Sequence, residues 1–259
     1  MSTNEWETKI TEINPNKITI HGYRIDELMG KVPFSHMIYL LIRGELPPEN
    51  VGKLLDIMLV SSVDHGVTPP STLAAITATS TGAPINAAIS AGILSINKFH
   101  GGAIERCMKT ILEIEKLAKE KNIPLKEASL EIARTYREKK RRFSGFGHRI
   151  HTDDPRTEKL LESARKLGLY GEKAQTLSFI KDAIKETSGK DLPINVDGAL
   201  AGLLLEIGMP VALANTFFIM ARIPGLVAHI FEETTLQKPM RRICPTMYKY
   251  TGKPERSLK

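Results

Sequence analysis

The stretch Ser144-Gly145-Phe146-Gly147-His148-Arg149-Ile150 says more about the fold and chemistry of this chain than any other. His148, whose imidazole can titrate near neutral pH, follows two glycines and precedes Arg149. The glycines allow backbone conformations that other residues rarely adopt. Asp154-Pro155-Arg156 follows closely and supplies a second arginine. Because arginine binds carboxylates and phosphates through two parallel hydrogen bonds, this segment predicts a site for an anionic carbonyl compound.

Two further segments flank this stretch. Phe99-His100-Gly101-Gly102-Ala103 precedes it and Asn195-Val196-Asp197-Gly198 follows it, so that His, His and Asp occur in that order. With these segments the chain resembles the citrate synthase superfamily. The resemblance covers nearly the whole chain and rests also on residues 22–28 (GYRIDEL), 40–47 (LLIRGELP) and 221–229 (ARIPGLVAH).

The chain is short for this superfamily. Citrate synthases are substantially longer and carry additional helices in the larger domain, whereas this chain has 259 residues. A compact version of the fold is typical of citryl-CoA lyases, including the lyase module at the end of ATP citrate lyase. The resemblance is therefore closest in character to citryl-CoA lyase.

The composition indicates a globular protein. A chain of 259 residues, 42% of them hydrophobic, can form one large core or two unequal domains. Cys107 and Cys244 are too few for a disulfide framework, so we expect a reducing, cytoplasmic environment. The first seven residues are polar and acidic, which argues against a signal or transit peptide. No His, Cys and Asp residues have metal-ligand spacing, and no metal is expected.

The net charge of +7 favours anionic partners, which include nucleic acid, a membrane surface and a ligand rich in phosphate and carboxylate. Nucleic acid is not expected, since the chain lacks a helix-turn-helix motif or stacking platform and only 6% of its residues are aromatic. A membrane is not expected either. The most apolar region, residues 198–220, is interrupted by Glu206 and Gly208-Met209-Pro210 and predicts two core helices.

Apolar residues recur at helical spacing almost everywhere, for example over residues 160–167, which predicts an all-α protein. Residues 17–20, with Gly22 as a turn, are compatible with a short strand in an N-terminal β ribbon. The resemblance implies a citrate synthase-like architecture. In it, a large discontinuous helical domain (residues 1–102 and 213–259) is interrupted by a smaller helical domain (residues 103–212), and the substrate lies in the cleft between them.

The resemblance also assigns a reaction. Joining or cleaving a carbon–carbon bond between acetyl-CoA and a keto acid passes through a thioester enolate. This requires a proton-transferring carboxylate, a donor to the enolate oxygen, and an acid or base at the keto acid's oxygen. Carried over by motif, these groups are Asp197, His100 and His148 in that order. In the cleavage direction His148 would take the hydroxyl proton of citryl-CoA, and Asp197 would protonate the departing enolate.

The resemblance further implies which residues bind the substrate. Arg156 and Arg222 match two of the family's carboxylate ligands. His65 matches a third substrate contact, and a buried structural histidine is the alternative interpretation. His229 occupies a family-like position after an alanine, and we interpret it as structural.

Coenzyme A is expected as part of the substrate and product, with no separately bound cofactor. Glycines let backbone amides approach a phosphate, and the predicted contacts are Gly145, Phe146, Gly147 and Arg149. The basic run Lys139-Lys140-Arg141-Arg142 is either a solvated helix end or a further phosphate site. Between His148 and Arg156 the chain is one residue shorter than is usual in synthases, and Thr152 stands where a basic residue is common.

The C-terminal region departs from the family pattern. Synthases place an arginine immediately before a proline and contribute it to the neighbouring subunit's site, whereas here Cys244 precedes Pro245. Either Arg241 or Arg242 substitutes for it, or this carboxylate contact is missing. The sharing of site residues implies a homo-oligomer with a two-fold dimer as its unit.

The leading hypothesis is a citryl-CoA lyase, which splits citryl-CoA into acetyl-CoA and oxaloacetate. It would pair functionally with a separate citryl-CoA synthetase in the reductive tricarboxylic acid cycle. The alternatives are a minimal citrate or methylcitrate synthase, favoured by His100, and a non-catalytic CoA-binding subunit that needs a partner. The apolar helices at residues 74–93 and 203–220 are candidates for the dimer interface, and an ordinary buried core explains them equally well.

Overall fold

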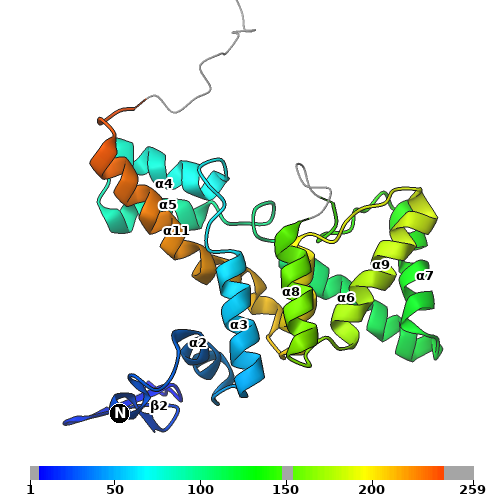
Figure 1. Cartoon of the computed structure of the whole chain (residues 1–259), viewed down its shortest axis with the longest axis horizontal. Coiled ribbons are helices and arrows are strands. Elements are labelled where there is room, and N and C mark those ends of the chain that lie inside the picture. Colours follow the sequence, from blue (N-terminus) through cyan, green and yellow to red (C-terminus); the bar gives the residue numbers. More distant parts are fainter. Residues whose placement is uncertain (1–5, 148–153, 242–259) are drawn as a thin grey trace, which may run out of the picture.

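The computed structural model describes residues 6–147 and 154–241. The predictions for His148, Arg149, Arg242 and Cys244 therefore fall outside the described residues. Within them the chain is predominantly helical with one small sheet, which confirms the predicted fold class (Figure 1). The helical elements are α1 (Ile25–Leu28), α2 (Phe34–Arg43), α3 (Glu49–Ser61), α4 (Pro70–Ser80), α5 (Ile85–Leu94), α6 (Ala103–Lys121), α7 (Leu125–Glu138), α8 (Pro155–Lys166), α9 (Glu172–Ser188), α10 (Val196–Glu206), the 3-10 turn η1 (Val211–Leu213) and α11 (Ala214–Leu236).

The N-terminal ribbon is an antiparallel sheet of order β1-β2-β3, built from β1 (Thr11–Asn14), β2 (Lys17–Ile20) and β3 (Tyr23–Arg24). Left-handed backbone angles close its turns, with φ of 61° at Asn16 and 86° at Gly22. Asn and Gly adopt this region at low cost. The strand predicted at residues 17–20 is thus confirmed, with Gly22 in the turn that follows it.

The main hydrophobic core forms around α6 and α10. α6 is amphipathic and buries a stripe from Ile104 to Ala118 at three- and four-residue spacing. α10 buries nearly all of its residues and packs against α6, α8 and α9. The segment Gly208-Met209-Pro210 interrupts the helical conformation between α10 and α11. The two helices predicted in this apolar region are therefore confirmed.

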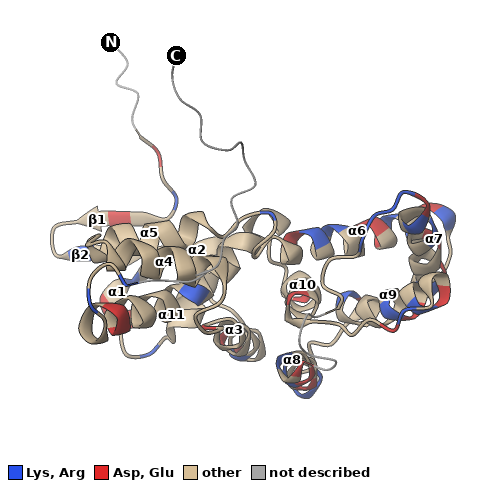
Figure 2. Cartoon of the chain, turned by 90° about the horizontal axis from the view of Figure 1, so that it is seen from above, with Lys and Arg blue, Asp and Glu red and all other residues tan. Residues whose placement is uncertain are grey.

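A second, much smaller cluster joins α4, α5 and α11. Among the described residues its fully buried members are Ala75, Ala88, Leu226 and Ile230. The stretch Val211–Leu236 is long and apolar enough to cross a membrane by length and composition, a test that core helices of soluble proteins also pass; 39% of its apolar window is buried. α4 and α5 carry no charged residue, whereas α6, α7 and α9 carry many of both signs (Figure 2).

The elements are arranged along the long axis of the molecule. Figure 1 shows α6, α7 and α9 at one end and α4, α5 and α11 toward the other, with α3 beside α8 between them. Leu54, Leu55 and Met58 of α3 belong to the main core, and α3 packs against α8. The division into domains at residues 102/103 and 212/213 remains a prediction.

Candidate active site

A cavity of about 490 Å³ lies where α4, α8, α10 and α11 meet the turn that precedes α6. Its volume is in the range typical of small-molecule sites. It brings together residues selected from the sequence that are far apart in the chain: His65, His100, Gly147, Arg156, Asp197 and Arg222. The cavity is therefore the candidate active site.

Asp197 lies in the first turn of α10, where helix dipole and free amides favour an anion. The helix begins at Asn195, whose side-chain oxygen accepts a hydrogen bond from the Gly198 amide at 3.2 Å. Asp197 is only partly accessible, and burial raises the pKa of its carboxyl to about 6, although Arg156 and other nearby arginines oppose this. A carboxyl that titrates near neutrality can serve as a general acid or base.

His100 is held by its own turn and by α4. Its backbone exchanges two hydrogen bonds with Asn97, of 2.8 and 3.1 Å, and its ring meets Phe218 edge-on with centroids 5.7 Å apart. Its Nε2 lies 2.8 Å from the hydroxyl oxygen of Ser71, at the start of α4. Burial, assisted by the charge of Arg222, lowers the pKa of His100, so its neutral form is favoured.

Arg222 is the most deeply buried cation that lines the cavity, with 2% of its surface exposed. Its Nε donates to the Ser62 carbonyl at 3.0 Å, and its guanidinium lies over the Phe218 ring at 4.8 Å. Within the described part of the chain its Nη1 has no hydrogen-bond partner. Burying a guanidinium nitrogen without a hydrogen-bond partner costs free energy. An anionic ligand that accepts a hydrogen bond from this nitrogen would remove that cost.

Arg156 is oriented by an ion pair at the start of α8. Its Nε and Nη2 donate to the two carboxylate oxygens of Asp154 at 3.0 and 2.8 Å. Asp154 is also the N-cap of α8 and accepts the backbone amide of Arg156. The pair fixes the plane of the guanidinium at the cavity wall, as recognition of a planar carboxylate requires.

The glycine loop is bonded to the start of α10. Asn195 donates two hydrogen bonds to this loop: its backbone amide donates to the Gly145 carbonyl at 3.0 Å, and its side-chain amide donates to the Gly147 carbonyl at 2.8 Å. Gly145 has φ of +87°, and a Cβ there would lie 2.7 Å from the Cα of Gly198. The Gly147 amide donates to the Pro193 carbonyl at 2.7 Å. This amide is therefore already used inside the protein, and Gly145 serves close packing.

A second cavity, of about 520 Å³, adjoins the first at Gly147. Its cationic lining comes from the ends of α7 and α9 and the segments that follow them: Arg137, Lys140, Arg141, Arg142 and Lys190. Phe143 and Phe146 add an aromatic wall, with their rings 6.2 Å apart and edge-on. The basic run thus borders a hollow beside the candidate active site. Lys190 lies far from this run in the sequence, and no local pattern marks it as a phosphate contact.

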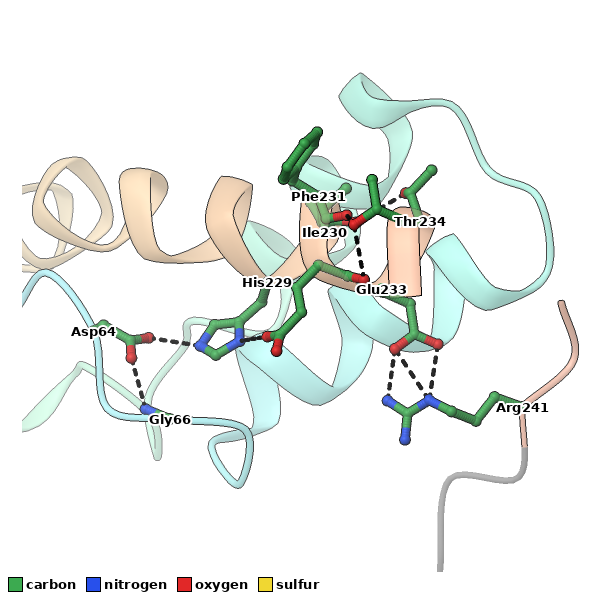
Figure 3. A network of polar contacts seen from close by, with 10 residues as sticks. Asp64, Gly66, His229, Ile230, Phe231, Glu233, Thr234 and Arg241 are labelled. Atoms are coloured by element: carbon green, nitrogen blue, oxygen red, sulfur yellow. Dashed lines mark hydrogen bonds and ion pairs between the residues drawn. The ribbon is translucent and has the colours of Figure 1, made fainter. Parts of the chain in front are cut away.

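Arg241 is engaged within its own chain. It donates to Glu233 of α11 through Nε and Nη2, at 3.0 and 2.6 Å to the two carboxylate oxygens (Figure 3). Glu233 is 5% exposed, whereas Arg241 is exposed, so the arginine covers a buried carboxylate from the solvent side. Of the two arginines considered as substitutes for the family's C-terminal carboxylate ligand, Arg241 is thus already paired.

Sequence reasoning missed Ser71 and Asn195, which hold His100 and the glycine loop. Pro69-Pro70 before Ser71 is typical of a helix start, and an asparagine ahead of an apolar run, such as Asn195, is typical of a helix cap, but the long-range partners of both residues leave no local signal. In the described ranges, 6–147 and 154–241, no group of three or more His, Cys, Asp or Glu side chains could hold a metal ion.

Comparison with known proteins adds independent findings. The family model "Citrate synthase, C-terminal domain" matches residues 47–243. Citrate synthase 2 of Bacillus subtilis is 32% identical over 202 residues, covering 77% of this chain and 51% of its own length. The citrate synthase of Haloferax volcanii is 29% identical over 227 residues, covering 84% and 55%. The chain thus spans about half the length of these curated relatives.

Two solved structures are similar over almost the whole chain. The citryl-CoA lyase of Hydrogenobacter thermophilus has a TM-score of 0.89 and 38% identity, and the match covers 98% of this chain and 97% of that one. The ATP citrate lyase of Methanothrix soehngenii has a TM-score of 0.80 and 21% identity, covering 98% of this chain and 43% of that one. The second likeness concerns the fold alone.

Proposed function

The chain belongs to the citrate synthase family, and from this we propose that it is a citryl-CoA lyase, an enzyme that cleaves citryl-CoA to acetyl-CoA and oxaloacetate. One observation carries the choice of lyase. The Hydrogenobacter thermophilus citryl-CoA lyase is 38% identical to this chain over 98% of this chain and 97% of that protein, whereas the citrate synthases of Haloferax volcanii and Bacillus subtilis are 29% and 32% identical over about half of their own length.

The proposed cleavage uses Asp197 as the acid. His148 takes the hydroxyl proton of citryl-CoA, the new carbonyl of oxaloacetate forms, and the electrons of the broken carbon–carbon bond enter the thioester as an enolate. Asp197 then protonates the enolate carbon, which yields acetyl-CoA. The pKa of about 6 supports this role, since a measurable fraction of the carboxyl is protonated near neutral pH.

His100 is proposed to bind the enolate oxygen as a neutral imidazole. Its lowered pKa supports the neutral form, which has one donor and one acceptor nitrogen. If Ser71 donates its hydroxyl proton to Nε2, the proton of the ring resides on Nδ1. Nδ1–H is then the donor for the thioester oxygen, and Ser71 sets the tautomer that makes this possible.

Arg156 and Arg222 are proposed to hold the carboxylates of the citryl group. One is oriented by Asp154 and the other has a buried, unpaired Nη1. Coenzyme A enters as part of the substrate, with its phosphates against the basic residues of the second cavity. In this proposal the thioester lies between the two cavities, beside Gly147, which lines both of them.

A minimal citrate or methylcitrate synthase is the second candidate. His100 lines the cavity together with Arg156 and Asp197, and a histidine at this position is the synthase pattern that the resemblance implies. Both reactions use the same carbon–carbon step. They differ in whether the thioester of citryl-CoA is hydrolysed.

The decisive experiment supplies citryl-CoA to the purified chain and follows oxaloacetate and free CoA thiol together. Oxaloacetate with little free thiol is the expected result. Citrate and free thiol would establish the synthase instead. If neither oxaloacetate nor free CoA thiol is formed, the result would favour a non-catalytic subunit that needs a partner. Asp197→Asn is the control, because it removes the proposed acid with little change in volume.

We further propose a homo-oligomeric, cytoplasmic enzyme that pairs functionally with a citryl-CoA synthetase in reductive tricarboxylic acid metabolism. The oligomer is supported by apolar side chains that stay exposed on α5 and α11: Ile85, Leu94, Phe231 and Leu236. Residues 203–206, part of one candidate interface, belong to α10, which lies in the core. The interface is therefore proposed on α4, α5 and α11.

A further inference from the structure

One face of α11 docks against the connection between α3 and α4. Arg222 donates to the Ser62 carbonyl, and His229 Nε2 lies 3.0 Å from Asp64 Oδ1 (Figure 3). Between them, a Cβ on Gly225 would lie 2.3 Å from the Val63 carbonyl oxygen, so the two backbones touch. Residues 222, 225 and 229 are spaced by three and four, which aligns them on one helix face.

The two oxygens of the Asp64 carboxylate bind different partners. Its Oδ1 faces His229, and its Oδ2 accepts the amide of Gly66 at 2.9 Å. Gly66 has φ of +72°, which a residue with a Cβ rarely adopts. The carboxylate therefore closes a tight turn around His65 and ties that turn to α11.

His65 is the residue that this turn presents. It lines the candidate active site together with Arg222, Arg156 and Asp197. Its neighbours on both sides, Asp64 and Gly66, are bonded as described, so its backbone has little freedom to shift. His229 itself does not line that cavity, and only 15% of its side chain is exposed.

We propose that His229 and Asp64 are a positioning pair that holds His65 at the wall of the active site. This inference rests on the proposed function, because His65 contacts the substrate only if that function is correct. It assigns His229 a role beyond general stability: through Asp64, α11 fixes the distance between His65 and Arg222. Neither His229 nor Asp64 is proposed to touch the substrate.

The test is a double-mutant cycle on His229 and His65. His229→Ala is expected to raise the KM for the keto acid or citryl-CoA about tenfold, the size of one lost charge-assisted hydrogen bond, with a smaller effect on kcat. In a His65→Ala background the same change is expected to have almost no further effect. His229→Gln, whose amide can still donate to Asp64, is expected to restore most of the affinity.

A purely structural role would give equal losses in both backgrounds and would overturn the proposal. Thr235→Val is the matched control, because its hydroxyl bonds only to carbonyls of its own helix. A second readout is independent of turnover: the imidazole NMR signal of His65, assigned with His65→Ala. It is expected to move in His229→Ala and not in Thr235→Val. An unmoved His65 signal overturns the positioning role, whereas an inactive wild type would count against the proposed function alone.

Discussion

Asp197 illustrates the conflict between stability and chemistry at a single residue. Its folded pKa of about 6 lies above the ordinary value of 3.8, so the folded chain binds this proton more tightly than the unfolded chain. Stability from this group is complete below about pH 4 and is lost as the pH rises through about 6. At neutral pH the protein therefore carries a buried charge that it would be more stable without.

Asp197→Asn is expected to lower kcat by about 10²- to 10⁴-fold and to stabilise the fold. At about pH 8 the gain in unfolding free energy is at most about 3 kcal/mol, and near pH 4 it is close to zero. Urea unfolding at both pH values, beside the citryl-CoA assay, measures this. A variant that is inactive and also less stable at both values would contradict the assignment of a functional, strained carboxyl.

The same pKa predicts opposite pH profiles for the two directions. Cleavage needs Asp197 protonated and His148 unprotonated, so the ionisation of Asp197, with a pKa of about 6, is expected to give kcat/KM for citryl-CoA a falling limb on the alkaline side that approaches tenfold per pH unit. Condensation needs the carboxylate, and its kcat/KM is expected to fall at pH values below this pKa. Initial rates across the pH range in both directions test this. A cleavage kcat/KM that shows no falling limb on the alkaline side would exclude Asp197 as the acid.

Arg222→Lys is expected to raise the KM for the keto acid roughly 10- to 100-fold while kcat changes less. Lysine keeps the charge but cannot donate to the Ser62 carbonyl and to a carboxylate in the same plane. Steady-state kinetics in both directions measure the effect. Arg165→Lys is the control, because Arg165 lies on α8 against Tyr170, away from the cavity lining. Equal affinities in wild type and Arg222→Lys would contradict the proposed carboxylate contact.

At the scale of elements, the start of α10 organises the glycine loop. Asn195 caps the helix through its side-chain oxygen and binds the Gly147 carbonyl through its side-chain nitrogen. A Cβ on Gly198 would lie 2.4 Å from the Gly145 oxygen, so helix and loop are in direct backbone contact. The position of Asp197 therefore depends on a residue two positions earlier that carries no charge.

Asn195→Ala is expected to lower the unfolding free energy by about 1–2 kcal/mol and to reduce turnover. Asn195→Ser separates the two effects, because serine retains the helix cap and loses the bond to Gly147. It is expected to recover most of the stability and little of the activity. Chemical denaturation and the citryl-CoA assay distinguish these outcomes, and full activity in Asn195→Ser would show that the bond to the loop is dispensable.

At the scale of the whole molecule, the two ends differ in how they bury apolar surface. The main core encloses α6 and α10, whereas α4, α5 and α11 share a cluster with few buried residues. Ile85 is 54% exposed and Phe231 is 68% exposed on these helices. Apolar side chains exposed on helices that pack together are expected where a partner covers them, which favours a second copy against this face.

The purified chain is therefore expected to be at least a dimer by analytical ultracentrifugation. Combined Ile85→Arg and Phe231→Arg substitutions are expected to shift it toward monomer, since two buried charges would face an apolar partner. Leu112→Arg is the matched control, because Leu112 is an exposed leucine, 37% accessible, on α6. A wild-type monomer, or equal mass in both variants, would contradict the proposed interface.

Local sequence patterns are enough to predict the helical class, the ribbon strand at residues 17–20, the break between α10 and α11, and the family. These features are local, since helical spacing, turn residues and short motifs are legible from neighbouring positions. The sequence also selected His100, Asp197, Arg156 and Arg222, because their motifs carry the chemistry in residue type and order.

How these residues meet becomes apparent from the folded chain alone. The fold placed Ser71 beside His100, packed Gly145 against Gly198, paired Arg241 with Glu233, and tied His65 to α11 through Asp64 and His229. The raised pKa of Asp197 is likewise a product of packing, since burial is its largest cause. These contacts join distant parts of the chain, and their energies depend on burial and distance, which no local pattern of residues encodes.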